Sequence, residues 1–156
     1  MKTELIYVGK QTDRSVAALI QDYAQRINHY MPFGLVEVPD LKNARHLSED
    51  EQCQREGMGI LQRVEAADVV VLLDERGKEM RSMEFAQWLQ KRLAGGRKLS
   101  FVIGGAYGFS PDVYARANDK VSISKMTFTH QMVRLIFVEQ LYRACTILKG
   151  EKYHHE

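Results

Sequence analysis

Residues 101–111 read Phe-Val-Ile-Gly-Gly-Ala-Tyr-Gly-Phe-Ser-Pro. A short apolar run ends here in three glycines within five residues, and Ser110-Pro111 then begins a predicted helix. Because glycine lacks a Cβ atom, the backbone can turn sharply and lie against a flat ligand. In an α/β protein, small ligands bind at the carboxyl ends of buried strands. The stretch therefore predicts a ligand-binding turn. The alternative is a plain strand-to-helix turn in which Gly105 or Gly108 has a positive φ and nothing binds.

Strand and helix patterns alternate along the whole chain. Short apolar runs predict strands at residues 5–8, 35–38, 69–73, 99–103 and 121–124. Apolar residues at helical spacing predict helices at residues 13–30, 48–66, 82–93, 111–117 and 130–148. Such alternation is typical of an α/β domain with a mostly parallel sheet and helices on both faces. We expect a single domain over residues 1–156, because no linker or internal repeat interrupts the pattern.

Two segments carry more detailed predictions. The charged run at residues 74–78 predicts a turn after the preceding strand. Ser48 and Glu51 have the spacing of a capping box and predict the start of the second helix. Gly57 and Gly59 weaken that helix by about 1 kcal/mol each relative to alanine. We therefore expect it to be frayed or interrupted.

Composition limits the class of protein. The chain has 156 residues, of which 45% are hydrophobic and 27% charged, and its net charge is +2. These values predict a soluble globular protein, and RNA binding would need a local basic patch or two patches paired by symmetry. Cys53 and Cys145 lack metal-ligand spacing, so we expect free thiols in a reducing cytoplasm and no metal. No signal peptide or membrane segment is predicted.

The last predicted helix, at residues 130–148, has almost no polar face. Apolar residues fill most of its positions: Met132, Val133, Leu135, Ile136, Phe137, Val138, Leu141, Tyr142, Ala144, Cys145, Ile147 and Leu148. A helix that is apolar nearly all round must be buried on nearly all sides. One sheet covers only one side, so we expect a homodimer built partly on this helix. The alternative is a central core helix in a monomer.

Four further segments complete a resemblance to a known family. They are Leu72-Leu73-Asp74 with Arg76-Gly77-Lys78, the run Ser122 to His130, Val133-Arg134 with Glu139 to Ala144, and the terminal Tyr153-His154-His155-Glu156. Together with residues 101–111 they resemble the SPOUT-class 23S rRNA (pseudouridine-N3)-methyltransferases, the ribosomal large subunit methyltransferase H family. The resemblance covers the whole chain.

The resemblance implies a fold, a cofactor and an assembly. It implies an α/β knot whose C-terminal part, at approximately residues 100–156, is threaded as a trefoil knot, which the periodicity alone does not predict. It implies an obligate homodimer with S-adenosyl-L-methionine bound in the knot at the interface. Carried over by position, the cofactor-binding residues are Leu73, Gly104, Gly105, Ile123, Ser124, Lys125, Met126, Thr127 and Phe128. The alternative for residues 122–128 is an ordinary strand and loop.

The chemistry that the resemblance implies needs a base and a cation. N3 of pseudouridine must lose its proton, and the negative charge that results must be stabilised. We assign these catalytic roles to His154 as base or proton shuttle, Tyr153 as the group that orients the target base, and Arg143 as the cation. The alternatives are an inert tail and an Arg143 that simply pairs with Glu139 one turn earlier. Arginine is frequent in the family where this chain has His155, so a phosphate contact there would be weaker here.

The implied substrate is large-subunit ribosomal RNA in the assembled ribosome. No dedicated RNA-binding motif is present, so we expect a shallow basic face that spans the dimer. One alternative is a SPOUT methyltransferase that acts on another RNA, such as tRNA. A second is a non-catalytic nucleotide-binding or ribosome-associated domain, although residues 104–108 lack both the GxGxxG pattern and a P-loop.

Overall fold

A parallel sheet forms the centre of the molecule. In the computed structural model, which describes residues 2–156, its strands are β1 (Thr3–Val8), β2 (Phe33–Val38), β3 (Val69–Glu79), β4 (Leu99–Ile103) and β5 (Asp119–Ser122). They lie in the order β2-β1-β4-β3-β5, and each neighbouring pair is parallel. The carboxyl ends of these strands therefore meet at one edge of the sheet.

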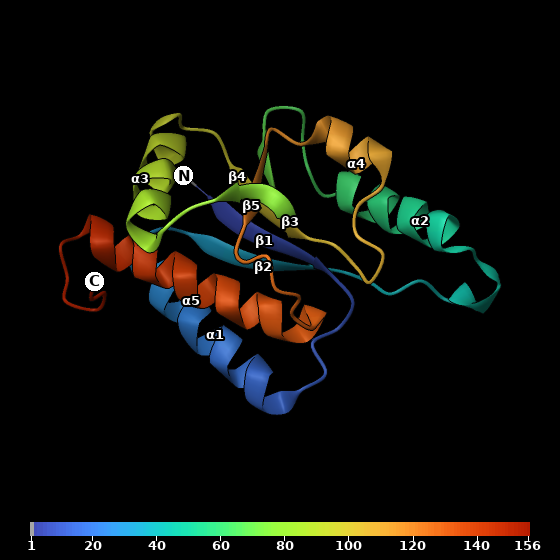
Figure 1. Cartoon of the computed structure of the whole chain (residues 1–156), viewed down its shortest axis with the longest axis horizontal. Coiled ribbons are helices and arrows are strands. Elements are labelled where there is room, and N and C mark those ends of the chain that lie inside the picture. Colours follow the sequence, from blue (N-terminus) through green and yellow to red (C-terminus); the bar gives the residue numbers. More distant parts are fainter. Residues whose placement is uncertain (1) are drawn as a thin grey trace.

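Helices cover both faces of this sheet (Figure 1). α1 (Arg14–Asn28), α3 (Ser82–Ala94) and α5 (His130–Leu148) pack on one face, and α2 (Glu49–Leu61) and α4 (Pro111–Arg116) pack on the other. A short 3-10 helix, η1 (Ala44–His46), precedes α2. The prediction of an α/β fold with a parallel sheet covered on both sides is confirmed.

The alternation of side chains along each strand divides the core in two. Leu5 and Phe101 point toward α1, α3 and α5, whereas their neighbours Ile6 and Val102 point toward α2 and α4. All four are fully buried. A strand that is covered on both faces is mostly apolar, which explains the apolar runs in the sequence. The buried polar pair Glu4 and Ser100 satisfies itself, because Ser100 Oγ donates to Glu4 Oε1 at 3.0 Å.

Side-chain caps fix where most helices begin. The Asp13, Ser48, Ser110 and Thr129 side chains each accept a hydrogen bond from a backbone N–H in the first turn of the helix that follows. The predicted cap at Ser48 is thereby confirmed. Ser82 does not cap α3. Its hydroxyl donates instead to Gln140 Oε1 at 3.0 Å and so ties α3 to α5.

The predicted turn at residues 74–78 is wrong. β3 continues to Glu79, and Lys78 pairs with Val121 after a register shift that begins at Leu73. At Gly77 the backbone lies so close to β5 that a Cβ atom would stand 2.6 Å from the carbonyl carbon of Lys120. The charged residues suggest a turn, but pairing with the edge strand β5 keeps this segment extended and leaves residues 74–77 as a bulge.

The predicted interruption of the second helix is also wrong, because α2 runs unbroken through both glycines. A Cβ atom at Gly57 would overlap Ser110 Oγ, and one at Gly59 would stand 2.7 Å from Val38 Cγ1. The glycines therefore allow close packing of α2 on α4 and β2. This packing compensates for the helix propensity that they cost.

α5 lies between α1 and α3 against the sheet, and part of its apolar surface remains open. Its buried residues are Arg134, Phe137, Val138, Leu141, Ala144, Cys145 and Thr146. Its half-buried apolar residues are Val133, Leu135, Ile136, Tyr142, Ile147 and Leu148, and Met132 is 40% exposed. Neighbouring helices thus cover more of α5 than the sequence suggests, without burying all of it. Among residues 2–156, none of the helices combines the length and the apolar character that crossing a bilayer requires.

Candidate active site

A cleft of about 800 Å³ opens at the carboxyl edge of the sheet. Its walls come from the end of β3, residues 103–109, residues 123–129 and the first turn of α5. Eight of the nine predicted cofactor residues line it: Leu73, Gly104, Gly105, Ile123, Ser124, Met126, Thr127 and Phe128. Lys125 does not line it, because its ammonium group extends to Glu79 Oε1 at 3.4 Å on the exposed surface.

The glycine turn is shaped by a short internal hydrogen bond. Gly108 N donates to Gly105 O at 3.1 Å, and Gly108 has a φ of +77°, so the sequence-based expectation of a positive φ holds at this glycine. Gly104 faces the same turn, and a Cβ atom there would stand 3.0 Å from Gly108 O. Ser110 then caps α4. The turn therefore presents bare backbone to the cleft.

α2 supports the glycine turn from behind. Glu56 is 6% exposed, and its Oε1 would be 2.5 Å from a Cβ atom placed on Gly105. This oxygen has no hydrogen-bond partner among the described residues. Burial is the main cause that raises the pKa of Glu56 above its ordinary value. Cys53 lies one turn earlier on α2 and is a free thiol. Its Sγ atom lies 3.6 Å from Gly108 O.

Charged side chains gather at the β3 side of the cleft. Asp74, Glu75 and Arg76 all line it, so carboxylates outnumber cations on this wall. Tyr114 donates its hydroxyl to Asp74 Oδ2 at 2.5 Å, and Arg76 N donates to Asp74 Oδ1 at 2.9 Å. Burial, with the Asp74 carboxylate, raises the pKa of Tyr114 to about 12. Tyr114 therefore remains a donor at neutral pH, and this wall suits a cationic ligand. Across residues 2–156, no group of His, Cys, Asp and Glu side chains is arranged to hold a metal ion.

The loop opposite the glycine turn is held by its own serines. Ser122 Oγ donates to Ser124 O at 3.1 Å, and Met126 N donates to Ser124 Oγ at 2.9 Å. Met126 is 77% exposed and stands at the rim of the cleft. Ile123 and Phe128 also border an adjoining apolar cavity of about 380 Å³ beside α3 and α5. The loop thus combines apolar walls with backbone groups, as in most small-molecule sites.

The three predicted catalytic residues form one cluster at the other end of α5. Glu139 is at its centre, because its Oε1 accepts from Arg143 Nη2 at 2.5 Å and from Tyr153 Oη at 3.1 Å. Arg143 Nη1 lies 3.1 Å from Nδ1 of His154, and its guanidinium stacks 4.8 Å from the centre of the Tyr153 ring. The pairing of Arg143 with Glu139 is therefore real, but it does not exclude a contact with the tail.

The tail is anchored to the helices rather than free. Tyr153 packs edge-on against Tyr142, with ring centres 4.8 Å apart, and its hydroxyl lies 3.4 Å from that of Tyr23 on α1. Tyr30 donates to Glu151 at 2.9 Å. Burial first, then the contacts with Tyr23 and Glu139, raise the pKa of Tyr153 well above its ordinary value of 10.0. At neutral pH Tyr153 is therefore a hydroxyl donor.

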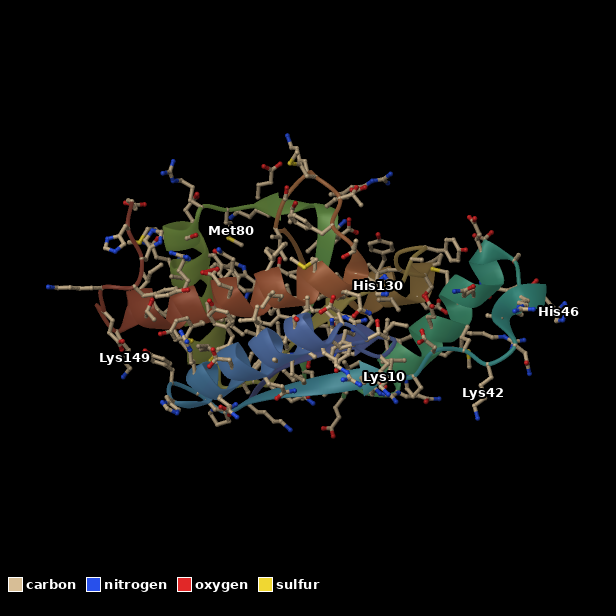
Figure 2. All side chains as sticks on the ribbon, turned by 90° about the horizontal axis from the view of Figure 1, so that it is seen from below. Lys10, Lys42, His46, Met80, His130 and Lys149 are labelled. Atoms are coloured by element: carbon tan, nitrogen blue, oxygen red, sulfur yellow. The ribbon has the colours of Figure 1, made fainter. Side chains whose placement is uncertain are left out.

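The cleft and the tail cluster do not meet within one chain. His130 and Val133 line the cleft, whereas Arg143 belongs to the cluster. At a rise of 1.5 Å per residue, Val133 and Arg143 are about 15 Å apart along the helix. Figure 2 shows His130 and Lys149 toward opposite ends of α5. The main cleft and the tail cluster of one chain therefore lie at separate positions along α5, although the adjoining cavity reaches Gln140, whose amide donates to Glu139 Oε2 at 2.9 Å.

Several site residues are not marked as functional groups by the sequence. The spacing of four residues between Glu139 and Arg143 indicates an ion pair on a helix, but it does not indicate that Tyr153 joins the pair. Asp74 follows an apolar strand, and its position in the sequence does not show that it lines a cleft. Tyr23 and Tyr153 are 130 residues apart, and no local pattern joins them. The support of the glycine turn by Glu56 likewise depends on the packing of α2.

Comparison with known sequences gives a consistent result. The model of the family described as "Predicted SPOUT methyltransferase" matches residues 1–154. "Ribosomal RNA large subunit methyltransferase H" of Bacteroides fragilis and that of Bacteroides thetaiotaomicron are each 52% identical to this chain, over 100% of both partners. The protein of the same name from Christiangramia forsetii is 52% identical over 99% of each chain.

Comparison with solved structures supports the same fold. A probable methylase family protein from Haemophilus influenzae superposes on 99% of this chain and 70% of its own, with a TM-score of 0.53 and 14% identity. A probable methyltransferase from Bordetella pertussis superposes on 92% of this chain and 95% of its own, with a TM-score of 0.53 and 13% identity. At these identities the likeness concerns the fold alone.

Proposed function

The chain belongs to the SPOUT methyltransferase family, and from that premise we propose that it methylates N3 of a pseudouridine in large-subunit ribosomal RNA, with S-adenosyl-L-methionine as the donor. Full-length relatives named as large-subunit rRNA methyltransferases make it a methyltransferase enzyme. The observation that carries the assignment of the site is the cleft, in which eight predicted cofactor residues from distant segments meet.

The residues of the cleft fit this cofactor. S-adenosyl-L-methionine supplies a methyl group on a positively charged sulfur. Asp74 and Glu75 provide negative charge on one wall, and Ile123 and Phe128 provide apolar surface for an adenine on another. The absence of Cβ atoms at Gly104 and Gly105 lets the turn close on Gly108 and pack against Glu56, which gives this wall of the cleft its shape. Lys125, which extends away, would contribute through its backbone alone.

We propose that the tail of a second copy completes each site. The distance along α5 keeps a chain's own cluster away from its cleft, and the half-buried apolar residues of α5 offer a surface for pairing. An isologous dimer in which the two α5 helices run antiparallel brings the C-terminal end of each next to the cleft of the other. Residues 1–156 then form one domain, and the family implies a trefoil knot at approximately residues 100–156.

The chain's residues would act on the target base by position and charge. N3 of the target base would lose its proton to His154 or to solvent, and its lone pair would attack the methyl carbon. The carbon–sulfur bond would break as the nitrogen–carbon bond forms, and its electrons would stay on sulfur, which leaves as a neutral thioether. Arg143, fixed by Glu139, supplies a cation for the negative charge on the base, and Tyr153 supplies a hydroxyl donor and an aromatic face. His154 stands in the same cluster as base or donor.

A methyl-transfer assay tests this function. Purified protein and labelled S-adenosyl-L-methionine are incubated with whole ribosomes, free large subunits or total tRNA, and the labelled nucleoside is identified. We expect N3-methylpseudouridine in ribosomal RNA, with whole ribosomes as the preferred, cytoplasmic substrate. Label in tRNA alone would mean that the enzyme is a SPOUT methyltransferase that acts on tRNA instead of ribosomal RNA. Label in another nucleotide of the large-subunit RNA would contradict the pseudouridine assignment.

A further inference from the structure

His154 makes an unusual pair of contacts within the tail cluster. Its Nδ1 lies 3.1 Å from Nη1 of Arg143. Its Nε2 is buried and has no hydrogen-bond partner among the described residues. The residue as a whole is only half-buried, so other atoms of the ring are exposed to solvent. One ring nitrogen is thus occupied by the protein, and the other is available.

The contact with Arg143 decides which nitrogen carries the proton. A guanidinium group has five N–H donors and no acceptor, so the atom facing it must offer a lone pair. Nδ1 of His154 must therefore be unprotonated, and a neutral ring then carries its proton on Nε2. In this arrangement Nε2 has no lone pair with which to remove a proton from a substrate. The geometry is that of a hydrogen-bond donor.

We propose that His154 serves as a neutral Nε2–H donor to a carbonyl oxygen of the target base, and that it is not the general base. The inference rests on the proposed function. N3 of a uracil ring lies between two carbonyl groups, so the charge left when N3 loses its proton to solvent spreads onto both oxygens. A preorganised donor aimed at one of them stabilises that charge, as oxyanion-hole donors do.

Glu139 is the residue that positions Arg143 and, through it, the His154 ring. It accepts hydrogen bonds from both Arg143 and Tyr153, and Arg143 in turn orients the imidazole. The charged group that contacts His154 is therefore the Arg143 cation, and the Glu139 carboxylate and the Tyr153 hydroxyl stand behind it in the cluster. A buried donor that lacks a partner destabilises the free protein. A ligand oxygen that satisfies it recovers that cost, so the free cluster is poised to bind an acceptor.

Amide substitutions separate a donor from a base. In His154→Gln the side-chain amide can place an N–H near the position of Nε2 but cannot take up a proton. His154→Asn carries the same amide closer to the backbone, and His154→Ala carries none. We expect single-turnover methyl transfer to ribosomes to fall about 100-fold in the Ala and Asn variants and to stay within about 10-fold of wild type in the Gln variant. His46→Gln, exposed on η1 at the far end of the molecule, is the matched control (Figure 2).

The dependence of the rate on pH gives a second readout. For a donor, wild type and His154→Gln share the same pH profile. For a base, the wild-type profile contains a limb that disappears in His154→Gln. Equal loss of activity in the Gln, Asn and Ala variants, together with such a limb, would overturn the donor role.

Nitrogen NMR tests the tautomer without any activity. In protein labelled with 15N-histidine, one of five ring systems belongs to His154 and is assigned with His154→Gln. We expect a neutral Nε2–H ring, and in Arg143→Gln a mixture of the two tautomers. A wild-type ring protonated on Nδ1 would refute the inference. A wild-type protein that transfers no methyl group would instead contradict the proposed function, and the tautomer would still decide the inference.

Discussion

At the scale of single residues, one wall of the cleft depends on a close contact between a glycine and a buried carboxyl group. Gly105 lies against Glu56 Oε1, and a methyl group there would stand 2.5 Å from that oxygen. We expect Gly105→Ala to weaken S-adenosyl-L-methionine binding about tenfold, because the methyl group either displaces the buried Glu56 carboxyl group from behind the turn or moves the turn into the cleft. Calorimetric titration measures the affinity. Gly34→Ala is the control, since the nearest neighbour of a Cβ atom at this position would be Lys2 Cε at 3.9 Å. Unchanged affinity in Gly105→Ala would show that the turn yields without cost.

The carboxyl group of Glu56 gives a prediction for pH. Burial raises its pKa above the ordinary value of 4.5, so the folded protein binds this proton more tightly than the unfolded chain. Its contribution to the free energy of unfolding is therefore present at low pH and is lost as the pH rises from 4.5 through the raised folded value.

We expect Glu56→Gln to be more stable than wild type by about 1 kcal/mol near neutral pH, and the two to converge in acid. Urea unfolding between about pH 4 and pH 8 measures the difference. The exposed Glu65→Gln is the control. A constant difference across this range would show that Glu56 does not titrate in the window that its burial implies.

At the scale of elements, α2 shows how packing overrides propensity. Alanine at Gly57 would gain about 1 kcal/mol of helix propensity. Its Cβ atom would, however, overlap Ser110 Oγ and stand 3.1 Å from Val113 Cγ2 on α4. We expect Gly57→Ala to destabilise the protein by a net 1–3 kcal/mol, roughly the cost of overpacking a core. Chemical denaturation checks this value. A more stable variant would mean that α4 moves away freely.

The differences between the expected and the observed elements show which features the sequence can predict. Periodicity places every strand and α-helix near its true position, because each apolar stripe faces a core that the alternating pattern already implies. It fails at residues 74–78 and at Gly57, where the outcome depends on β5 and α4, segments distant in the chain. The residues that the family resemblance assigns to the cofactor line one cleft, except for Lys125, and their role in binding stays a prediction. The distance between this cleft and the tail cluster could not be predicted, since it depends on the direction of α5.

At the scale of the whole molecule, the open face of α5 predicts the oligomeric state. We expect sedimentation at twice the 18.0 kDa mass of the chain. Met132→Glu places a charge on the exposed surface of α5 and should shift the protein toward monomer. The helix itself should not be destabilised, because an acidic side chain in the first turn interacts favourably with the helix dipole. Met58→Glu, at a methionine that is 61% exposed on α2, should remain dimeric. A wild-type monomer would contradict the shared site.

If each active site takes its cleft from one chain and its tail from the other, two impaired variants can restore one another at a concentration of S-adenosyl-L-methionine well below the dissociation constant of Gly105→Ala. Gly105→Ala impairs the cleft and keeps the tail, whereas His154→Ala impairs the tail and keeps the cleft. In a mixed dimer with antiparallel α5 helices, one of the two sites has both parts intact. Random pairing makes about half of the dimers mixed, so co-expression should restore about one quarter of wild-type methyl transfer. The two variants purified separately and assayed together without exchange provide the baseline. Activity that stays at this baseline, with mixed dimers verified by affinity tags, would mean that each chain uses its own tail, and α5 would then have to release the tail cluster to reach the cleft.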